Sequence, residues 1–473
     1  MKTPYFAGLF GLLLVGQASG KTIPNHAAAD LVLGQPDFTS ADDPAPLTSF
    51  RSQNPVCVLV DPISRKVFVG EASGDRILRY PNVAALTNGA PAEAVFGTVS
   101  FSDGNGGSNA TGLLDPTGMF LDRFGRLWVA DSENNRVVVY EAAIYRGNGP
   151  TADLVFGQPN LTTVTPAATT NKMSIPTGVW IDANDSLWVA DSGNNRVLRF
   201  ASISTKVSGS AADGVLGQAL FTTSGAGFGA SGLQSPVSVT VSSAGTLFVS
   251  CRNGNRVMRF NNAAILSNGA AATAVLGQPD FNSTTSGLAA EKLNSPKGAF
   301  LTADDSLWVC DTFNRRVLRF SNASTKATGS AADGVVGQPD FITNISAATS
   351  RGLNIPQFSP FVDATGSLWV TDHDNNRVLR FPADVTRPLL TVVTQVPKST
   401  SDKTLSVKGT ASDAFGVVRV TYKVNSGSIK TATGTTGWKF KAALKKGKNT
   451  ITITAVDSVG NESVSKVIKI QRD

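Results

Sequence analysis

The chain has 473 residues, of which 41% are hydrophobic and 16% charged, and its 45 Gly and 23 Pro are spread along its length. This composition is typical of a folded protein and excludes a low-complexity chain, and the length predicts more than one domain. Residues 388–473 hold 12 Lys and 2 Arg against 4 Asp and 1 Glu, a net charge of +9, so residues 1–387 contribute −2 to the chain's total of +7. Because nucleic-acid binding needs a basic face, the larger part of the chain is not expected to bind nucleic acid.

The first twenty residues have the pattern of a secretory signal. Lys2 precedes an apolar run over residues 5–15, and small residues at positions 18–20 suit a cleavage site. The apolar run is shorter than the roughly 20 residues that cross a bilayer. We therefore expect residues 1–20 to be a signal peptide. The mature chain, without a transmembrane segment, is expected to be secreted, as an extracellular, periplasmic or cell-surface protein.

A repeat with a period of about sixty residues follows. Each copy begins with a proline before an apolar run, and successive prolines are 61, 60, 60, 60 and 60 residues apart: Pro55, Pro116, Pro176, Pro236, Pro296 and Pro356. In the third copy, residues 176–182, 187–191 and 196–200 are β-rich and separated by turn formers, which predicts three antiparallel strands. A Gly-Gln motif between copies, as at residues 216–218, follows apolar residues that predict a fourth strand. Six such units predict a six-bladed β-propeller and an all-β fold.

The order of the motifs predicts how the ring closes. The chain begins with a Gly-Gln strand near residues 30–34 that has no inner strands of its own, and the last copy ends at Phe381 without an outer strand. Pairing these two strands removes the open sheet edges that favour aggregation. We therefore predict one propeller domain over residues 21–386, with the ring closed by its N-terminal strand.

The repeated strands resemble those of NHL-repeat propellers, in which Val-Ala-Asp, a short polar turn and Asn-Arg-Val follow one another. Residues 189–191 and 195–197 match this pattern, and blades two, five and six carry the same motif or close variants of it. Blades one and four depart from it, with Glu71 and Cys251 at the Asp position, and no copy has the His that names the repeat. The resemblance implies the fold but no inherited chemistry.

The sixty-residue period stops after Pro388, and a different strand pattern begins. Six short runs are predicted as strands: residues 389–393, 405–408, 417–424, 438–441, 450–456 and 464–470. This pattern resembles a bacterial immunoglobulin-like domain, which implies a β-sandwich over residues 388–473. Residues 386–388 are the expected linker.

An Asp before each hairpin turn and an Arg after it form the most regular polar pattern of the repeat. Four copies carry the complete pair: Asp131 and Arg136, Asp191 and Arg196, Asp311 and Arg316, and Asp372 and Arg377. A ring of such charges would suit an anionic ligand. We favour a structural role, in which each Asp accepts hydrogen bonds from its own turn and from the Arg, because a binding site usually breaks the symmetry of its scaffold.

The aromatic residues at one equivalent strand position, Phe68, Trp128, Trp188, Phe248, Trp308 and Trp369, are expected to pack between blades.

The residues directly after the repeat prolines are Val56, Thr117, Thr177, Val237, Lys297 and Gln357, a set without a carboxylate. With only His26 and His373 in the chain, a His-rich zinc site and a serine-hydrolase base find little support. Asp37, Asp280 and Asp340 follow the Gly-Gln motif and are expected to stabilise turns, with a calcium or magnesium site as the alternative. The three cysteines, Cys57, Cys251 and Cys310, are expected to be buried free thiols.

Two features of the C-terminal part stand out. Asp413 and Asp457 lie near turns, where turn stabilisation is the favoured role and calcium binding the alternative. Lysines at positions 439, 441, 445, 446 and 448 form a basic cluster that would suit an anionic surface, although a solvated face is the simpler interpretation.

These patterns favour a non-catalytic interaction protein whose propeller loops bind a protein, peptide or glycan, with the sandwich as spacer or surface attachment. The prediction includes no catalytic residue, no metal ligand and no cofactor. The alternative is a metal-dependent hydrolase or lactonase, since six-bladed lactonases resemble this architecture and place carboxylates on a metal at the channel mouth.

Overall fold

The computed structural model describes residues 23–41, 54–103, 106–358, 360–414 and 416–473. The predicted signal peptide therefore lies outside the described residues. The chain divides into two compact units between Pro382 and Ala383, with Ile23 and Pro24 grouped with the second unit. This division lies a few residues before the linker predicted at residues 386–388.

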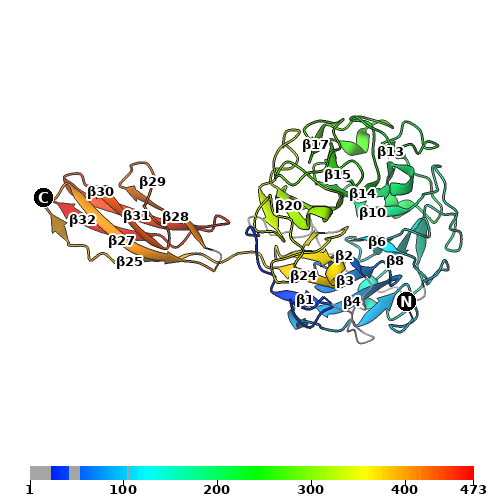
Figure 1. Ribbon diagram of the computed structural model, residues 1–473, viewed down its shortest axis with the longest axis horizontal. Coiled ribbons are helices and arrows are strands. Elements are labelled where there is room, and N and C mark those ends of the chain that lie inside the picture. The colour runs from blue at the N-terminus through cyan, green and yellow to red at the C-terminus, as the bar shows by residue number, and fades with distance from the viewer. Residues whose placement is uncertain (1–22, 42–53, 104–105, 359, 415) are drawn as a thin grey trace. The chain divides into compact units, whose positions relative to one another are not determined.

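The first unit contains six four-stranded antiparallel sheets, which Figure 1 shows face-on as a ring. Five sheets consist of consecutive strands: β2 (Pro55–Val60), β3 (Lys66–Glu71), β4 (Arg76–Asn82) and β5 (Ala94–Phe96); β6 (Pro116–Leu121), β7 (Leu127–Asp131), β8 (Arg136–Tyr140) and β9 (Leu154–Phe156); β10 (Pro176–Ile181), β11 (Leu187–Asp191), β12 (Arg196–Phe200) and β13 (Gly214–Leu216); β14 (Pro236–Val241), β15 (Leu247–Cys251), β16 (Arg256–Phe260) and β17 (Ala274–Leu276); β18 (Pro296–Leu301), β19 (Leu307–Asp311), β20 (Arg316–Phe320) and β21 (Gly334–Val336). The first strand of each of these five blades begins at a repeat proline, as the period predicts, whereas Pro356 of the sixth blade forms only an isolated bridge with Asp372.

The sixth blade combines both ends of the propeller. Its strands are β22 (Phe361–Val362), β23 (Leu368–Asp372), β24 (Arg377–Phe381) and β1 (Leu31–Leu33). Val32 pairs with Leu379, and Asp30 forms an ion pair of 2.8 Å with Arg380. The strand near residues 30–34 thus supplies the outer strand of the last blade.

Each blade strand is buried on both faces because the blades stack on each other, which explains why the strands are apolar without alternation. Along β11, Leu187 and Val189 pack in a cluster with Trp128 of the preceding blade. The intervening residue, Trp188, packs with Val249 of the following blade. The prediction that the aromatic position packs between blades is confirmed.

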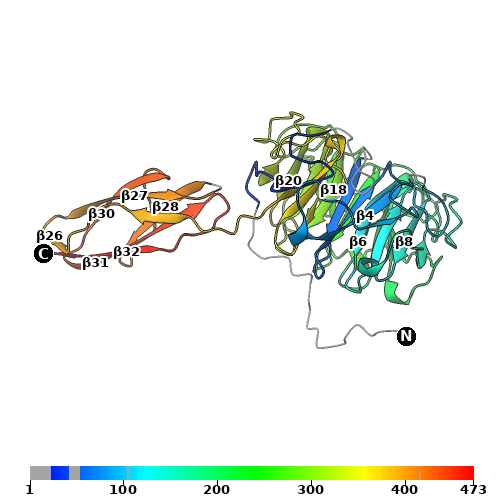
Figure 2. The same ribbon diagram turned by 90° about the horizontal axis from the view of Figure 1, so that it is seen from below.

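Antiparallel order places two kinds of connection on one side of the ring. The turns between second and third strands lie there, together with the long connections from each fourth strand to the next repeat proline. We call this side the loop face, and Figure 2 shows the blades turned by 90°. Seven short 3₁₀ turns complete the propeller: η1 (Val83–Ala85), η2 (Ala143–Tyr145), η3 (Ser192–Asn194), η4 (Ile203–Thr205), η5 (Ala263–Ile265), η6 (Thr312–Asn314) and η7 (His373–Asn375).

The second unit is a sandwich of two sheets. The three-stranded sheet has the order β25-β27-β30 and the five-stranded sheet the order β26-β32-β31-β28-β29. The strands are β25 (Leu389–Val392), β26 (Ser399–Thr400), β27 (Thr404–Ser412), β28 (Val417–Val424), β29 (Lys430–Thr431), β30 (Gly437–Ala443), β31 (Gly447–Asp457) and β32 (Lys466–Arg472). Their inward residues, including Val407, Trp438 and Ile451, form one core. Alternating buried and exposed residues along β30 identify a sheet with one solvated face.

Candidate functional site: the channel mouth on the loop face

The Asp and Arg of each predicted turn pair form an ion pair. In blade three, Arg196 Nε lies 2.6 Å from Asp191 Oδ2, and both side chains are fully buried. Asp191 also accepts hydrogen bonds from the Ser174 backbone N–H at 2.7 Å and from Asn194 Nδ2 at 2.8 Å. The other three pairs are equally buried, with distances of 2.6–2.7 Å: Asp131 with Arg136, Asp311 with Arg316, and Asp372 with Arg377.

The same arginines also contact the long loops. Arg196 donates to the backbone carbonyls of Thr169 and Lys172 in the loop before β10, and to that of Phe221 in the loop after β13. Arg136, Arg316 and Arg377 make equivalent contacts in their blades. Each guanidinium therefore joins two successive loops, so the pairs build the frame of the loop face and are not exposed to a ligand.

Blades one and four show what happens where the Asp is missing. Glu71 replaces it in blade one and still reaches Arg76, with a Nε–Oε2 distance of 2.5 Å. In blade four, Cys251 offers a thiol in place of the carboxylate, so the buried Arg256 forms no ion pair among the described residues. The two other Arg256 nitrogens keep their loop contacts, to Phe281 and Gly232. The loop contacts are thus common to both kinds of blade.

Aromatic side chains of the innermost strands meet inside the channel. Phe120 and Trp180 have ring centroids 4.9 Å apart, and Trp180 lies 5.8 Å from Phe300. Phe300 in turn lies 4.9 Å from Phe361. Because Trp180 and Phe300 belong to blades three and five, their contact crosses the channel. Sequence reasoning missed this cluster, although three of its members stand four residues after a repeat proline.

Charged residues gather at the loop-face end of the channel, where the inner strands begin. Lys297 is half-buried, and burial together with nearby Arg252 lowers its pKa to about 8. Asp115, directly before the proline of blade two, has its pKa raised to about 6, mainly by burial and further by Glu133 and Asp75. Lys297 and Asp115 interact electrostatically, each stabilising the other's charge. Lys297 Nζ also lies 5.7 Å from the centre of the Phe358 ring.

The hairpin turn of blade six adds a histidine and an acid to this group. His373 Nδ1 lies 2.7 Å from the carboxylate of Asp374. Burial lowers the pKa of His373, while its hydrogen bond to Asp374 acts in the opposite direction and Lys297 lowers the pKa further. The charge of Asp374 in turn raises the pKa of Lys297. We call Asp115, Lys297, His373 and Asp374 the channel-mouth group.

Carboxylates lie at the channel mouth although the residues directly after the repeat prolines, which include Lys297, contain no acid. The residue directly before the proline also faces this region, as Asp115 shows, and so do the hairpin turns. The available signal was departure from the repeat, because Asp115 stands where most other copies carry Ser or Ile.

The remaining candidate residues have structural surroundings. Asp280 Oδ1 accepts the backbone N–H groups of Asn282 and Ser283 at 2.8 Å, and these bonds lower the pKa of its exposed carboxyl. Asp37 and Asp340 hold turns in the same way. The three cysteines are free and buried, and burial raises the pKa of each thiol. These acids act in turns, and the thiols are protonated at neutral pH, which makes them poor nucleophiles.

The fold and its repeated pairs define a six-bladed β-propeller with NHL repeats, joined to a bacterial immunoglobulin-like domain. The NHL repeat model matches residues 173–200, and the bacterial Ig domain model matches residues 388–455. No curated protein matches the chain in sequence. Among the described residues, no helix has the length and apolar character needed to cross a membrane.

Solved structures with a similar fold differ widely in what they are. A virginiamycin B lyase from Staphylococcus aureus is 14% identical, with 71% of this chain and 86% of that chain covered and a TM-score of 0.38. A gluconolactonase from Xanthomonas campestris is 12% identical, with coverage of 78% and 99% and a TM-score of 0.42. An auxiliary nutrient binding protein from Bacteroides thetaiotaomicron is 10% identical, with coverage of 75% and 76% and a TM-score of 0.45. These likenesses concern the fold alone.

Proposed function

We propose that this chain is a secreted, non-catalytic binding protein that holds a protein, peptide or glycan at the channel mouth of its loop face. The observation that carries the proposal is the channel-mouth group, which breaks the repeat symmetry at the centre of a rigid face. The pattern of residues 1–20 and the match to a bacterial Ig domain support a place outside the cytoplasm.

Rigidity of the surrounding loops favours recognition. Most of the described loop segments are anchored by buried arginine contacts, so little conformational freedom is lost there when a partner binds. The channel-mouth group offers both a cation and carboxylates. Exposed apolar side chains stand at comparable places in other blades: Ile175, which is 42% exposed, directly precedes a repeat proline as Asp115 does, and Phe313, which is 48% exposed, lies in the hairpin turn of blade five. Mixed charge and apolar surface on a fixed frame suits a ligand that presents hydrogen-bonding and apolar groups together.

The side chains give weaker support for catalysis. Within the described part of the propeller, no cysteine is poised as a nucleophile, and the described hydrogen bonds pair no Ser or Thr hydroxyl with His373. The one described group of three converging acidic side chains lies in the second unit. A binding role uses the channel mouth without needing a nucleophile or a metal.

A second candidate function is an enzyme at the same place, and one observation favours it. Lys297 and Asp115 have pKa values of about 8 and about 6, on either side of neutral pH, and His373 is oriented by Asp374. Groups with such pKa values suit proton transfer. A hydrolase or lactonase acting there, with or without a metal ion, is therefore the alternative to be tested.

The sandwich is proposed to attach the protein to an anionic surface. The five clustered lysines are exposed, and Lys439 and Lys441 point outward from β30. Lys408 on β27 pairs directly with Lys439, which places like charges opposite each other. Such a pair costs stability, so a role in binding anions would explain why it is present.

The test uses the full chain on peptide and glycan arrays. Lys297→Met should weaken binding at least tenfold, because it removes the central cation while keeping the length of the side chain. Arg123→Gln is the matched control, since Arg123 is exposed in the turn between β6 and β7, on the side opposite the loop face. Equal binding by the two variants would contradict the proposal.

A parallel assay addresses the second candidate. Wild type and His373→Gln are compared on lactones, esters and glycosides with Ca²⁺, Mg²⁺ or Zn²⁺ added. Turnover that depends on His373 would replace the binding proposal by the enzyme.

A further inference from the structure

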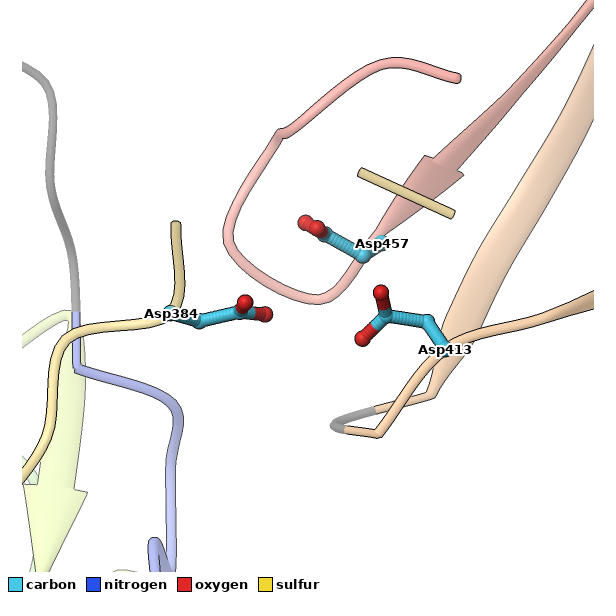
Figure 3. Close-up of side chains that lie close together, drawn as sticks. All are labelled: Asp384, Asp413 and Asp457. Carbon is cyan, nitrogen blue, oxygen red and sulfur yellow. The ribbon is translucent and has the colours of Figure 1, made fainter. Parts of the chain in front are cut away.

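Three aspartates of the second unit, from three separate segments, lie close together, as Figure 3 shows. Asp384 lies in the segment before β25, Asp413 in the loop between β27 and β28, and Asp457 at the end of β31. One carboxylate oxygen of each can be chosen so that all three lie within 4.8 Å of one another. Sequence reasoning noted Asp413 and Asp457 but missed Asp384, which lies within the range assigned to the propeller.

Turn stabilisation explains one oxygen of each buried aspartate. Asp457 Oδ1 accepts the backbone N–H groups of Val459 and Asn461, both at 2.9 Å. Asp384 Oδ1 accepts the backbone N–H of Thr386 at 3.0 Å and its hydroxyl at 2.7 Å. The favoured sequence interpretation, a role in turns, therefore accounts for these two Oδ1 atoms.

The second oxygens have no such explanation. Asp384 and Asp457 are each only 1% exposed, and the Oδ2 atom of each is buried without a hydrogen-bond partner. Among the described residues, neither side chain has a Lys or Arg within ion-pair distance. Burying a carboxylate oxygen without a donor or a cation is strongly unfavourable. Turn stabilisation alone therefore does not explain why these two carboxylate oxygens are buried.

Repulsion between the carboxylates adds to the case for a cation among them. Burial raises the pKa of Asp384, the hydrogen bonds from Thr386 lower it, and repulsion from Asp413 and Asp457 raises it. A divalent cation at the point of convergence would reverse this repulsion and would supply a partner for both Oδ2 atoms.

We propose that Asp384, Asp413 and Asp457 form a Ca²⁺ site. Calcium takes oxygen ligands at about 2.3–2.6 Å, so ligands on opposite sides of the ion lie about 4.6–5.2 Å apart, whereas around Mg²⁺ they lie about 4.0–4.2 Å apart. The carboxylate oxygens, which lie within 4.8 Å of one another, are close enough to share one calcium ion. Water would complete the coordination, as is usual for sites at a domain surface.

Calcium binding would join three segments of the second unit through one ion. The Asp384 segment is held to the two loops by a 3.3 Å hydrogen bond from Thr386 to Asp413 and by one of 3.2 Å from Asn461 Nδ2 to the Asp384 carbonyl. An ion shared by all three aspartates would fix residues 383–388 against the sandwich. The second unit would then be stabilised by calcium, independently of what the loop face of the propeller binds.

The experiment is a calorimetric titration of the full chain, stripped with a chelator, with CaCl₂ and separately with MgCl₂. We expect one Ca²⁺ per chain with a Kd on the order of 0.1–1 mM, the range of extracellular calcium modules. Asp384→Asn should weaken binding at least tenfold, because the amide keeps the Oδ1 acceptor for Thr386 and replaces the free oxygen by an NH₂ group. Asp402→Asn, at an exposed acid outside the cluster, should bind as wild type does.

Folding of each variant is checked by circular dichroism, and Asp413→Asn is a second variant at the half-buried ligand. Calcium should raise the melting temperature of the wild type and of Asp402→Asn but not of Asp384→Asn. The site would be refuted by the absence of binding heat at 10-fold excess over the expected Kd, or by equal affinity in Asp384→Asn and Asp402→Asn. Tighter binding of Mg²⁺ than of Ca²⁺ would refute the calcium assignment.

Discussion

The buried pair of Asp191 and Arg196 allows the structural role of the repeat to be tested quantitatively. Asp191→Ala removes the acceptor of Arg196 Nε at 2.6 Å, of the Ser174 N–H at 2.7 Å and of Asn194 Nδ2 at 2.8 Å. Because both charged groups are fully buried, the mutation leaves an unpaired cation in the interior. Breaking a buried pair from one side costs about 3–5 kcal/mol. This exceeds the about 1–3 kcal/mol that a partly buried hydrogen-bonded group would cost.

Two further variants of the same chain provide reference values for the stability change of Asp191→Ala. Cys251→Asp places a carboxylate beside Arg256, which has only a thiol at this position, and should raise stability by about 1–2 kcal/mol through a new charge-assisted hydrogen bond. Asp153→Ala breaks the exposed pair with Arg146, in which both side chains are about one-third exposed, and should cost less than about 1 kcal/mol.

The assay is guanidinium-induced unfolding followed by tryptophan fluorescence, which reports mainly on the propeller because five of the six Trp lie there. A cost for Asp191→Ala no greater than that for Asp153→Ala would refute the reasoning. Full stability combined with lost ligand binding would instead make the pair part of a binding site.

Three other predictions follow from the same structure. Deleting residues 25–38 removes β1 and the Asp30–Arg380 pair, so the propeller should lose several kcal/mol of stability; an unchanged melting temperature would contradict closure by this strand. Ligand binding that uses both Lys297 and Asp115 in their charged forms should be strongest between pH 6 and 8. It should fall below about pH 6 as Asp115 is protonated and above about pH 8 as Lys297 loses its proton, and Asp115→Asn should abolish the acid limb; binding measured at pH 5, 7 and 9 checks this. A fragment of residues 383–473 should fold alone by circular dichroism and elute from an anionic resin as salt rises, because charge attraction is screened within about 10 Å at 0.1 M salt; an unfolded fragment would contradict the domain division.

The sequence by itself determined the propeller, because a repeat encodes each blade locally. The prolines of the sixty-residue period mark the first residue of β2, β6, β10, β14 and β18, and the Asp–Arg spacing is that of a tight hairpin. The packing of the aromatic position between blades and the closure of the ring by the first strand could also be predicted, because both follow from the repeat. The main sandwich strands within residues 388–473 could be located from short apolar runs separated by turns.

Only the tertiary structure decided which side chains meet. Asp115 and Lys297 are 182 positions apart and interact because the ring brings the starts of its inner strands to one channel. Trp180 meets Phe300 across that channel for the same reason. Asp384 reaches Asp457 because three separate segments end at one edge of the sandwich. A periodic pattern specifies the environment of each strand through its immediate neighbours, whereas contacts across a channel or between loops depend on the closed geometry of the whole domain.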